Sequence, residues 1–96
     1  MNKETKIQRD IQTYLNKKRI FNFRVNADEN TVGIPDTVAC YCGHFIGIET
    51  KTPIGKLSPL QKSVGEAIKE NNGIFVVPTS LNDIKKIIEK IGTGNL

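Results

Sequence analysis

Residues 33–61 read Gly-Ile-Pro-Asp-Thr-Val-Ala-Cys-Tyr-Cys-Gly-His-Phe-Ile-Gly-Ile-Glu-Thr-Lys-Thr-Pro-Ile-Gly-Lys-Leu-Ser-Pro-Leu-Gln, and this stretch decides the fold. Two segments within it, 36–42 and 44–51, are rich in Val, Ile, Phe, Tyr and Thr and are separated by Gly43. β-branched and aromatic residues on either side of a glycine are typical of a tight hairpin. The stretch therefore predicts two antiparallel strands at the centre of the chain.

The length of the turn fixes which side chains of this hairpin meet. A two-residue turn at Cys42-Gly43 sets Tyr41 opposite His44. Counting outward from that pair sets Asp36 opposite Glu49. Directly opposed residues project to the same face, with Cβ atoms roughly 4.5–5.5 Å apart. The prediction depends on the turn, because a slip of one residue would send Glu49 to the other face.

Two carboxylates opposed this closely repel one another, and a divalent cation would relieve the repulsion. Hard ions such as Mg²⁺ bind through one or two carboxylates together with waters and phosphate oxygens. Lys51 lies two residues beyond Glu49 and shares its face, where an ammonium could polarise a water or hold a phosphate. The alternative is structural, since Pro-Asp is common turn chemistry and Glu-x-Lys often lies on a solvated strand.

The ordered string Gly-x-Pro-Asp, Ile-Glu-x-Lys and Gly-Lys-Leu-Ser-x-x-Gln resembles the VRR-NUC family of PD-(D/E)xK, restriction-endonuclease-like nucleases. The resemblance covers the whole length. It implies that Asp36 and Glu49 are metal ligands, with the backbone carbonyl of Thr50 as a third, and that Lys51 serves the attacking water. Gln61 matches a glutamine that lies near the active centre in this family.

The resemblance also implies an activity and its partners. It indicates a Mg²⁺-dependent endonuclease, with Mn²⁺ as a substitute, that hydrolyses DNA phosphodiester bonds and leaves 5′-phosphate and 3′-hydroxyl ends. Stand-alone members of the family resemble phage or viral proteins, and some resemble Holliday junction resolvases that act as symmetric dimers. We therefore expect a homodimer acting on branched DNA. The alternatives are a non-catalytic nucleic-acid-binding module and a nuclease subunit that needs a partner.

Length and composition constrain the number of domains, the class of partner and the location of the protein. Ninety-six residues predict one domain spanning 1–96. Lysine and arginine number 14 against 10 acidic residues, a net charge of +4 that suits a polyanion. No apolar run approaches the roughly 18 residues of a membrane span, so we expect a soluble, cytoplasmic protein with no membrane partner. Gly55-Lys56 does not have the spacing of a nucleotide-binding loop, so no nucleotide cofactor is expected.

The remaining elements follow from periodicity and capping signals. Residues 3–18 predict a helix with an apolar stripe of Ile7, Ile11, Tyr14 and Leu15. Residues 20–26 alternate as a strand. Ser58 and Pro59 open a second helix, whose predicted buried stripe is Leu60, Val64, Ala67 and Ile68.

A short apolar strand over residues 74–77 should run parallel in the same sheet. Ser80 and Asp83 open a third helix, with Leu81, Ile84, Ile87, Ile88 and Ile91 facing inward and residues 92–96 frayed. The fold class is therefore α/β: a restriction-endonuclease-like αβββαβ core with a mixed four-stranded sheet flanked by helices, and an extra C-terminal helix.

Two further residues have both a functional and a structural interpretation. Glu4 matches the position of a glutamate that many nucleases of this fold place near the metal, yet an acid in a first helical turn is also favoured by the helix dipole. Gln61 could orient water or phosphate, yet it also stands at the capping-box position of its helix.

Three cations are candidate contacts to nucleic acid: Arg24 on the first strand, Lys56 in the loop after the hairpin, and Lys62 in the second helix. Arg24 could equally be an ordinary exposed strand cation. The polar loop 27–33 should border the active site, because it leads directly into the Pro-Asp pair.

Cys40 and Cys42 lie two apart on one predicted strand, poorly aimed for a disulfide, and Cys-x-Cys-x-His lacks a fourth zinc ligand. We expect them to pack against a helix.

Overall fold

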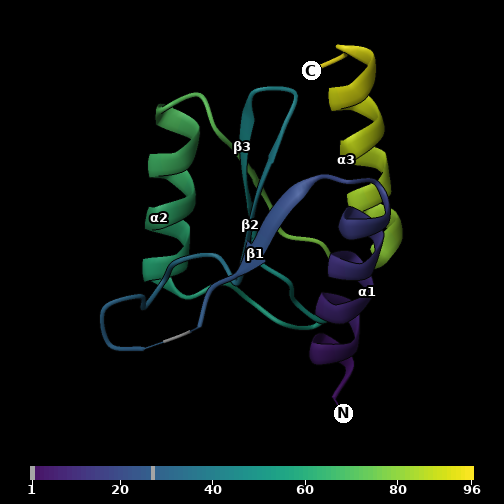
Figure 1. Cartoon of the computed structure of the whole chain (residues 1–96). Helices are drawn as coiled ribbons and strands as arrows, with labels where there is room; N and C mark the ends of the chain where they lie inside the picture. The colour runs from purple at the N-terminus through teal and green to yellow at the C-terminus, as the bar shows by residue number, and fades with distance from the viewer. Residues whose placement is uncertain (1, 27) are drawn as a thin grey trace.

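The computed structural model describes residues 2–26 and 28–96, which form seven elements (Figure 1). Ala27, at the start of the predicted loop 27–33, and Met1 lie outside the described residues. In chain order the elements are α1 (Lys3–Lys17), β1 (Phe21–Arg24), β2 (Thr37–Tyr41), β3 (His44–Ile48), α2 (Pro59–Glu70), β4 (Ile74–Val76) and α3 (Leu81–Thr93). This order confirms the predicted αβββαβ core and the extra C-terminal helix.

The four strands form one mixed sheet in the order β1-β2-β3-β4. The first three are antiparallel neighbours, and β4 runs parallel to β3. Tyr41 lies opposite His44 across a two-residue turn, as predicted. Cys42 and Gly43 both have positive φ, 51° and 80°, as a turn matched to the twist of the strands requires. The register on which the site prediction depends is therefore confirmed.

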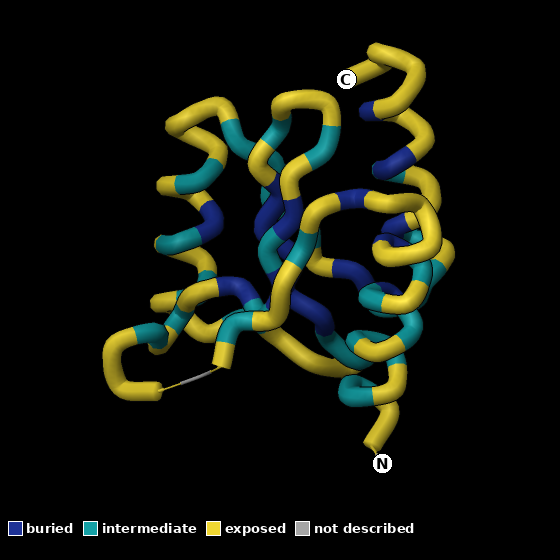
Figure 2. Tube along the Cα trace, viewed as in Figure 1, coloured by how far each residue is buried: buried dark blue, intermediate teal, exposed yellow. Residues whose placement is uncertain are grey.

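The helices cover the two faces of the sheet unequally. In Figure 1, α1 and α3 lie side by side on one face and α2 lies on the other. The buried residues gather between the sheet and the α1–α3 pair (Figure 2). The core consists of Ile11, Leu15, Ile20, Ala39, Ile46, Ile48, Ile84, Ile88 and Ile91. The predicted apolar stripes of the first and third helices thus form most of the core, with their remaining members partly buried against it.

The predicted buried stripe of the second helix is wrong in part. Leu60 is 47% exposed and Ala67 is also exposed, whereas Gly65 is buried. A Cβ on Gly65 would lie 2.4 Å from a ring carbon of Phe75 on β4. The helix therefore approaches the sheet through its glycine and packs over β4, with Ile68 reaching Gly47 on β3.

The placement of α2 leaves one face of β1 and β2 open. Cys40 lies on this face and is exposed, as is Cys42 in the turn, so the expectation that they pack against a helix is wrong. Both are free thiols. Phe21 on β1 lies opposite Cys40 on the same open face and is 68% exposed.

Side chains cap the helices at the predicted starts. Ser58 and Gln61 form a reciprocal capping box on α2, and Ser80 caps α3. The end of α3 differs from the prediction, because the helix continues through Thr93 and stops at Gly94, whose φ of 73° suits a glycine. None of the helices found in residues 2–26 and 28–96 is long and apolar enough to cross a membrane.

Candidate active site

Asp36 and Glu49 lie one residue beyond the paired ends of β2 and β3. The carbonyl oxygen of Asp36 accepts a hydrogen bond from the Val25 amide at 2.9 Å, and the amide of Glu49 donates to the Val76 carbonyl at 3.0 Å. The Thr50 amide donates to Oδ2 of Asp36 at 2.7 Å, which ties the two strand ends together. Backbone hydrogen bonds therefore fix both acids at the open end of the hairpin.

Burial and mutual repulsion disfavour the charged form of both acids. Glu49 is only 5% exposed, and its burial, followed by the charge of Asp36, raises the pKa of Glu49 to about 7. Burial also raises the pKa of Asp36, although hydrogen bonds from the Thr50 amide and the Thr37 hydroxyl oppose that rise. A hydrogen bond between the two carboxyl groups lowers the pKa of Asp36 and raises that of Glu49. Each carboxyl group therefore makes ionisation of the other less favourable.

The donor set of this pair fits a hard divalent cation. Two converging carboxylates that hold a proton near neutral pH would be relieved of their repulsion by such an ion. Within residues 2–26 and 28–96, no three His, Cys, Asp or Glu side chains gather closely enough to hold a metal by themselves. The chain thus offers two carboxylates, and a metal's remaining ligands would come from backbone oxygens, waters or a bound phosphate.

A hollow of about 280 Å³ lies beside the acidic pair. It is lined by Val25, Asp28, Thr31, Val32, Gly33, Ile34, Asp36, Glu49 and Gln61. The described part of the polar loop, 28–33, therefore borders the site as predicted. Gly33 has a φ of 84°, and a Cβ there would lie 2.6 Å from Cγ of Leu60. Only glycine lets the loop close this tightly onto the start of α2.

Gln61 caps α2 and also lines the hollow, so its position fits both the structural and the functional prediction. Its Oε1 accepts a hydrogen bond from the Ser58 amide at 2.8 Å, and its own amide donates to Oγ of Ser58 at 3.1 Å. The same side chain lines the hollow with Asp36 and Glu49. Because the cap uses the side-chain oxygen, the amide nitrogen Nε2 is the group of Gln61 that remains to meet a ligand.

Comparisons with known proteins bear on the fold of this site. No family model matches the chain, and no curated protein matches its sequence. Among solved structures, one described as "VRR_NUC domain" superposes with a TM-score of 0.79 at 20% identity, covering 93% of this chain and 97% of that chain. This chain has the fold of a VRR_NUC domain. The architecture expected from the ordered motifs is thereby confirmed, and the acidic pair lies at the end of the central hairpin of that fold.

Lys51 and Glu4 both act electrostatically on Glu49 within the VRR_NUC fold. The charge of Lys51 lowers the pKa of Glu49, and the charge of Glu4 raises it. The Lys51 amide donates to the Pro78 carbonyl at 3.1 Å, which fixes the strand that carries the lysine. Glu4 lies in the first turn of α1, where the helix dipole also favours an acid. The place of Glu4 therefore fits both a role near a metal and a role in stabilising the first turn of α1.

Gln8 is a site residue that the sequence prediction missed. Hydrogen bonding by the Gln8 side chain lowers the pKa of Asp36, and Nη2 of Arg24 donates to Oε1 of Gln8. Arg24 therefore connects β1 to α1 beside the site rather than standing free on its strand. The available signal was the spacing of Gln8 from Glu4, which puts both on one side of the helix.

The two remaining predicted cations do not line the hollow. Lys56 is exposed in the loop after Glu49, and Lys62 is exposed in the first turns of α2. Both are accessible to a ligand larger than the hollow.

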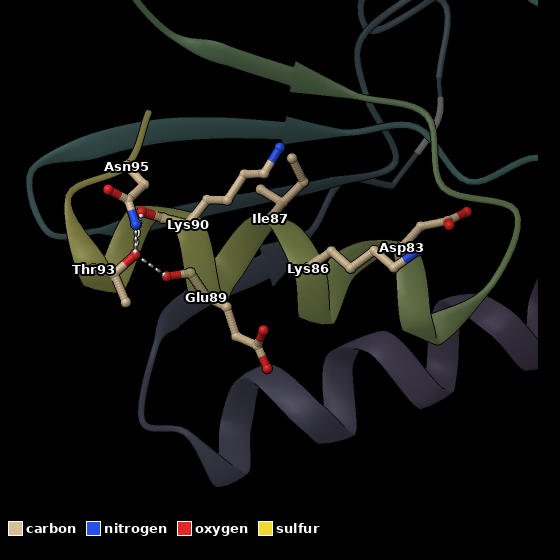
Figure 3. Close-up of a pocket in the computed structure, with 7 residues that line it drawn as sticks. All are labelled: Asp83, Lys86, Ile87, Glu89, Lys90, Thr93 and Asn95. Carbon is tan, nitrogen blue, oxygen red and sulfur yellow. Dashed lines mark hydrogen bonds between the residues drawn. The ribbon is translucent and has the colours of Figure 1, made fainter.

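A larger hollow of about 500 Å³ lies along α3 and contains none of the predicted site residues (Figure 3). Its side chains are Asp83, Lys86, Ile87, Glu89, Lys90, Thr93 and Asn95. Several of its polar groups are used within the helix end. The Thr93 hydroxyl donates to the Glu89 carbonyl at 3.0 Å, and Nδ2 of Asn95 donates to Oγ1 of Thr93 at 3.0 Å. The size of this hollow therefore does not make it the candidate active site.

Proposed function

We propose that this chain is a metal-dependent nuclease of the VRR-NUC type that hydrolyses DNA phosphodiester bonds. The observation that carries the proposal is the convergence of Asp36 and Glu49 at the open end of the hairpin, with the pKa of Glu49 raised to about 7. Two further observations support it. Lys51 lies close enough to act on the charge of Glu49, and the fold is that of a solved structure described as a VRR_NUC domain.

The residues divide the chemistry between holding an ion and acting on a water. Asp36, Glu49 and the backbone carbonyl of Thr50 would hold Mg²⁺, or Mn²⁺ as a substitute. When bound, the ion supplies positive charge to the scissile phosphate and acidifies a water. Lys51 orients that water and stabilises the negative charge that develops on the phosphate. Gln61 presents its Nε2 to the same hollow and contacts a phosphate oxygen.

Hydrogen bonds pre-organise this set of residues. The Thr50 amide and the Thr37 hydroxyl hold the Asp36 carboxylate in place, and Gln8 adds a contact from α1. Fixed donors around an ionised carboxylate cost little reorganisation when substrate arrives. Glu4 adds negative charge beside Glu49, which strengthens the attraction for a cation.

The charge of the chain suits DNA as the substrate. A net charge of +4 favours a polyanion, and Lys56 and Lys62 contact backbone phosphates at the margins of the site. We propose branched DNA, including Holliday junctions, and a homodimer. A two-fold dimer would set two such sites against two strands.

A cleavage assay tests the proposal. Purified wild-type protein, Asp36→Asn and the exposed-acid control Asp10→Asn are incubated with junction, flap, nicked and linear DNA in Mg²⁺, Mn²⁺ or EDTA. We expect metal-dependent products from wild type and the control, and none from Asp36→Asn. DNA binding without cleavage in either metal would favour a non-catalytic binding module. Cleavage that appears only when a larger partner protein is added, and that neither protein produces alone, would favour a partner-dependent subunit.

A further inference from the structure

Three phenylalanines lie exposed on the sheet face that carries α2: Phe21 and Phe23 on β1, which the helix leaves open, and Phe45 on β3, beside α2. Phe21 is 68% exposed, Phe23 49% and Phe45 46%. The register aligns Phe21 with Cys40 and Phe45 across three strands, so their side chains project to the same face. We call Phe21, Phe23 and Phe45 the aromatic face. A gathering of large apolar side chains on an open sheet indicates a binding surface.

The aromatic face leads into the candidate active site. Phe23 lies opposite Val38, one row closer to the hairpin's open end than Phe21. The next row holds Val25, whose amide bonds to Asp36 and whose side chain lines the hollow. Rows on one face of a strand are roughly 6–7 Å apart. Phe23 therefore lies in the row of side chains next to the row that holds Val25 and Asp36.

We propose that the aromatic face is a stacking platform for unpaired bases of the strand whose phosphate enters the site. The inference rests on the proposed nuclease function and specifies its substrate class as DNA with a single-stranded segment beside the scissile phosphate. Exposed aromatic rings on a sheet stack with bases whatever their sequence. A paired base has its faces covered within the duplex, so only an unpaired strand can use this surface.

The charge of the chain favours a nucleic acid as the occupant of this face. A net charge of +4 attracts a DNA strand, whose unpaired bases then meet exposed rings. The rings of Phe21 and Phe23 lie edge to face, with centroids 6.0 Å apart and an interplanar angle of 72°. The two rings are therefore not stacked on one another, and both side chains stay about half exposed or more, so that bases can reach them.

The test compares binding of an oligothymidylate with binding of an equally long oligonucleotide that has abasic positions. Fluorescence anisotropy is measured in EDTA, so that no strand is cut. Wild type should bind the base-containing strand at least about fivefold more tightly, the lower end of what one stacked base contributes. Phe21→Ala/Phe23→Ala should lose this preference and still bind the abasic strand as wild type does. Leu96→Ala, an exposed apolar control at the C-terminus, should keep it.

A second measurement uses the absence of tryptophan from the chain. Phe23→Trp keeps an aromatic ring on this face and provides a single fluorophore there. Its emission should be quenched by the base-containing strand and not by the abasic strand. Because Phe23 is half exposed, the substitution should leave the thermal unfolding midpoint unchanged, which circular dichroism checks.

The outcomes separate this inference from the nuclease proposal. Equal affinity of wild type for the two strands would overturn the platform, as would equal losses for both strands in the double alanine variant. A wild-type dimer that the double variant breaks in sedimentation, with strand preference unchanged, would assign the face to a second copy. If the preference depends on the two rings but no form of the protein cuts DNA, the platform stands and the nuclease proposal fails.

Discussion

Glu49→Gln should stabilise the metal-free protein at alkaline pH, although it removes a proposed metal ligand. The pKa of Glu49 rises from 4.5 to about 7 on folding, because burial and then the charge of Asp36 oppose ionisation. The folded state therefore holds this proton more tightly than the unfolded state does. The resulting stability is present in full below pH 4.5 and is lost as the pH rises through 7.

The magnitude follows from the two pKa values. Their separation corresponds to at most about 3 kcal/mol of unfolding free energy, and solvent at the mouth of the hollow reduces this to about 1–2 kcal/mol. In EDTA at pH 8, Glu49→Gln should exceed wild type by that amount in urea denaturation. At pH 4.5 the difference should be much smaller, because most of the wild-type carboxyl is then protonated.

Two comparisons show whether the pH dependence comes from Glu49 itself: a control variant and the addition of Mg²⁺. Glu66→Gln removes an exposed acid of α2 and should show no such dependence on pH. Saturating Mg²⁺ should reverse the order of wild type and Glu49→Gln, because only wild type gains the full binding energy of the ion. If Glu49→Gln is no more stable than wild type at pH 8 in EDTA, burial and the charge of Asp36 do not oppose ionisation of Glu49 as described.

Substitutions at three further positions give separate readouts. Lys51→Ala should lower the cleavage rate about 100-fold, the effect of losing one charge-stabilising donor, and an unchanged rate would remove Lys51 from the chemistry. Gln61→Ala should lower the free energy of unfolding by about 1 kcal/mol in urea denaturation, because the helix cap is lost. Gln61→Glu should keep the cap and its stability but cut DNA more slowly. Equal activity of Gln61→Glu and wild type would assign Gln61 to capping alone. Gly65→Ala should lower the free energy of unfolding by about 1–3 kcal/mol, because the added Cβ would collide with the Phe75 ring. The exposed control Ser63→Ala should leave it unchanged. An unchanged stability of Gly65→Ala would mean that α2 shifts freely on the sheet.

The predictable parts of the fold are those encoded by neighbouring residues. Cys42-Gly43 specifies a two-residue turn, and the register that places Asp36 opposite Glu49 follows by counting from it. Ser58 and Gln61 specify the start of α2 in the same local way. The stripes of α1 and α3 also follow from spacing, since each meets the core along one helix face.

The features that escaped prediction depend on how elements pack. Helical spacing identifies the apolar side of α2, but it does not show that Gly65 carries the closest contact and that Leu60 is left half exposed. The exposure of Cys40 follows from that same displacement of α2 over β4. Gln8 joins the site by hydrogen bonding to Asp36 across the packing of α1 on the sheet, a contact that depends on how the two elements pack.

Calorimetric titration of Mn²⁺ into the protein without DNA shows whether Asp36 and Glu49 share a divalent cation, as we propose. Wild type should bind the ion and release protons at pH 7, because Glu49 holds a proton that the ion displaces; repeating the titration in buffers of different ionisation enthalpy counts those protons. Asp36→Asn should lose both the binding heat and the proton release. Identical titrations for wild type and Asp36→Asn would show that Asp36 does not hold the ion.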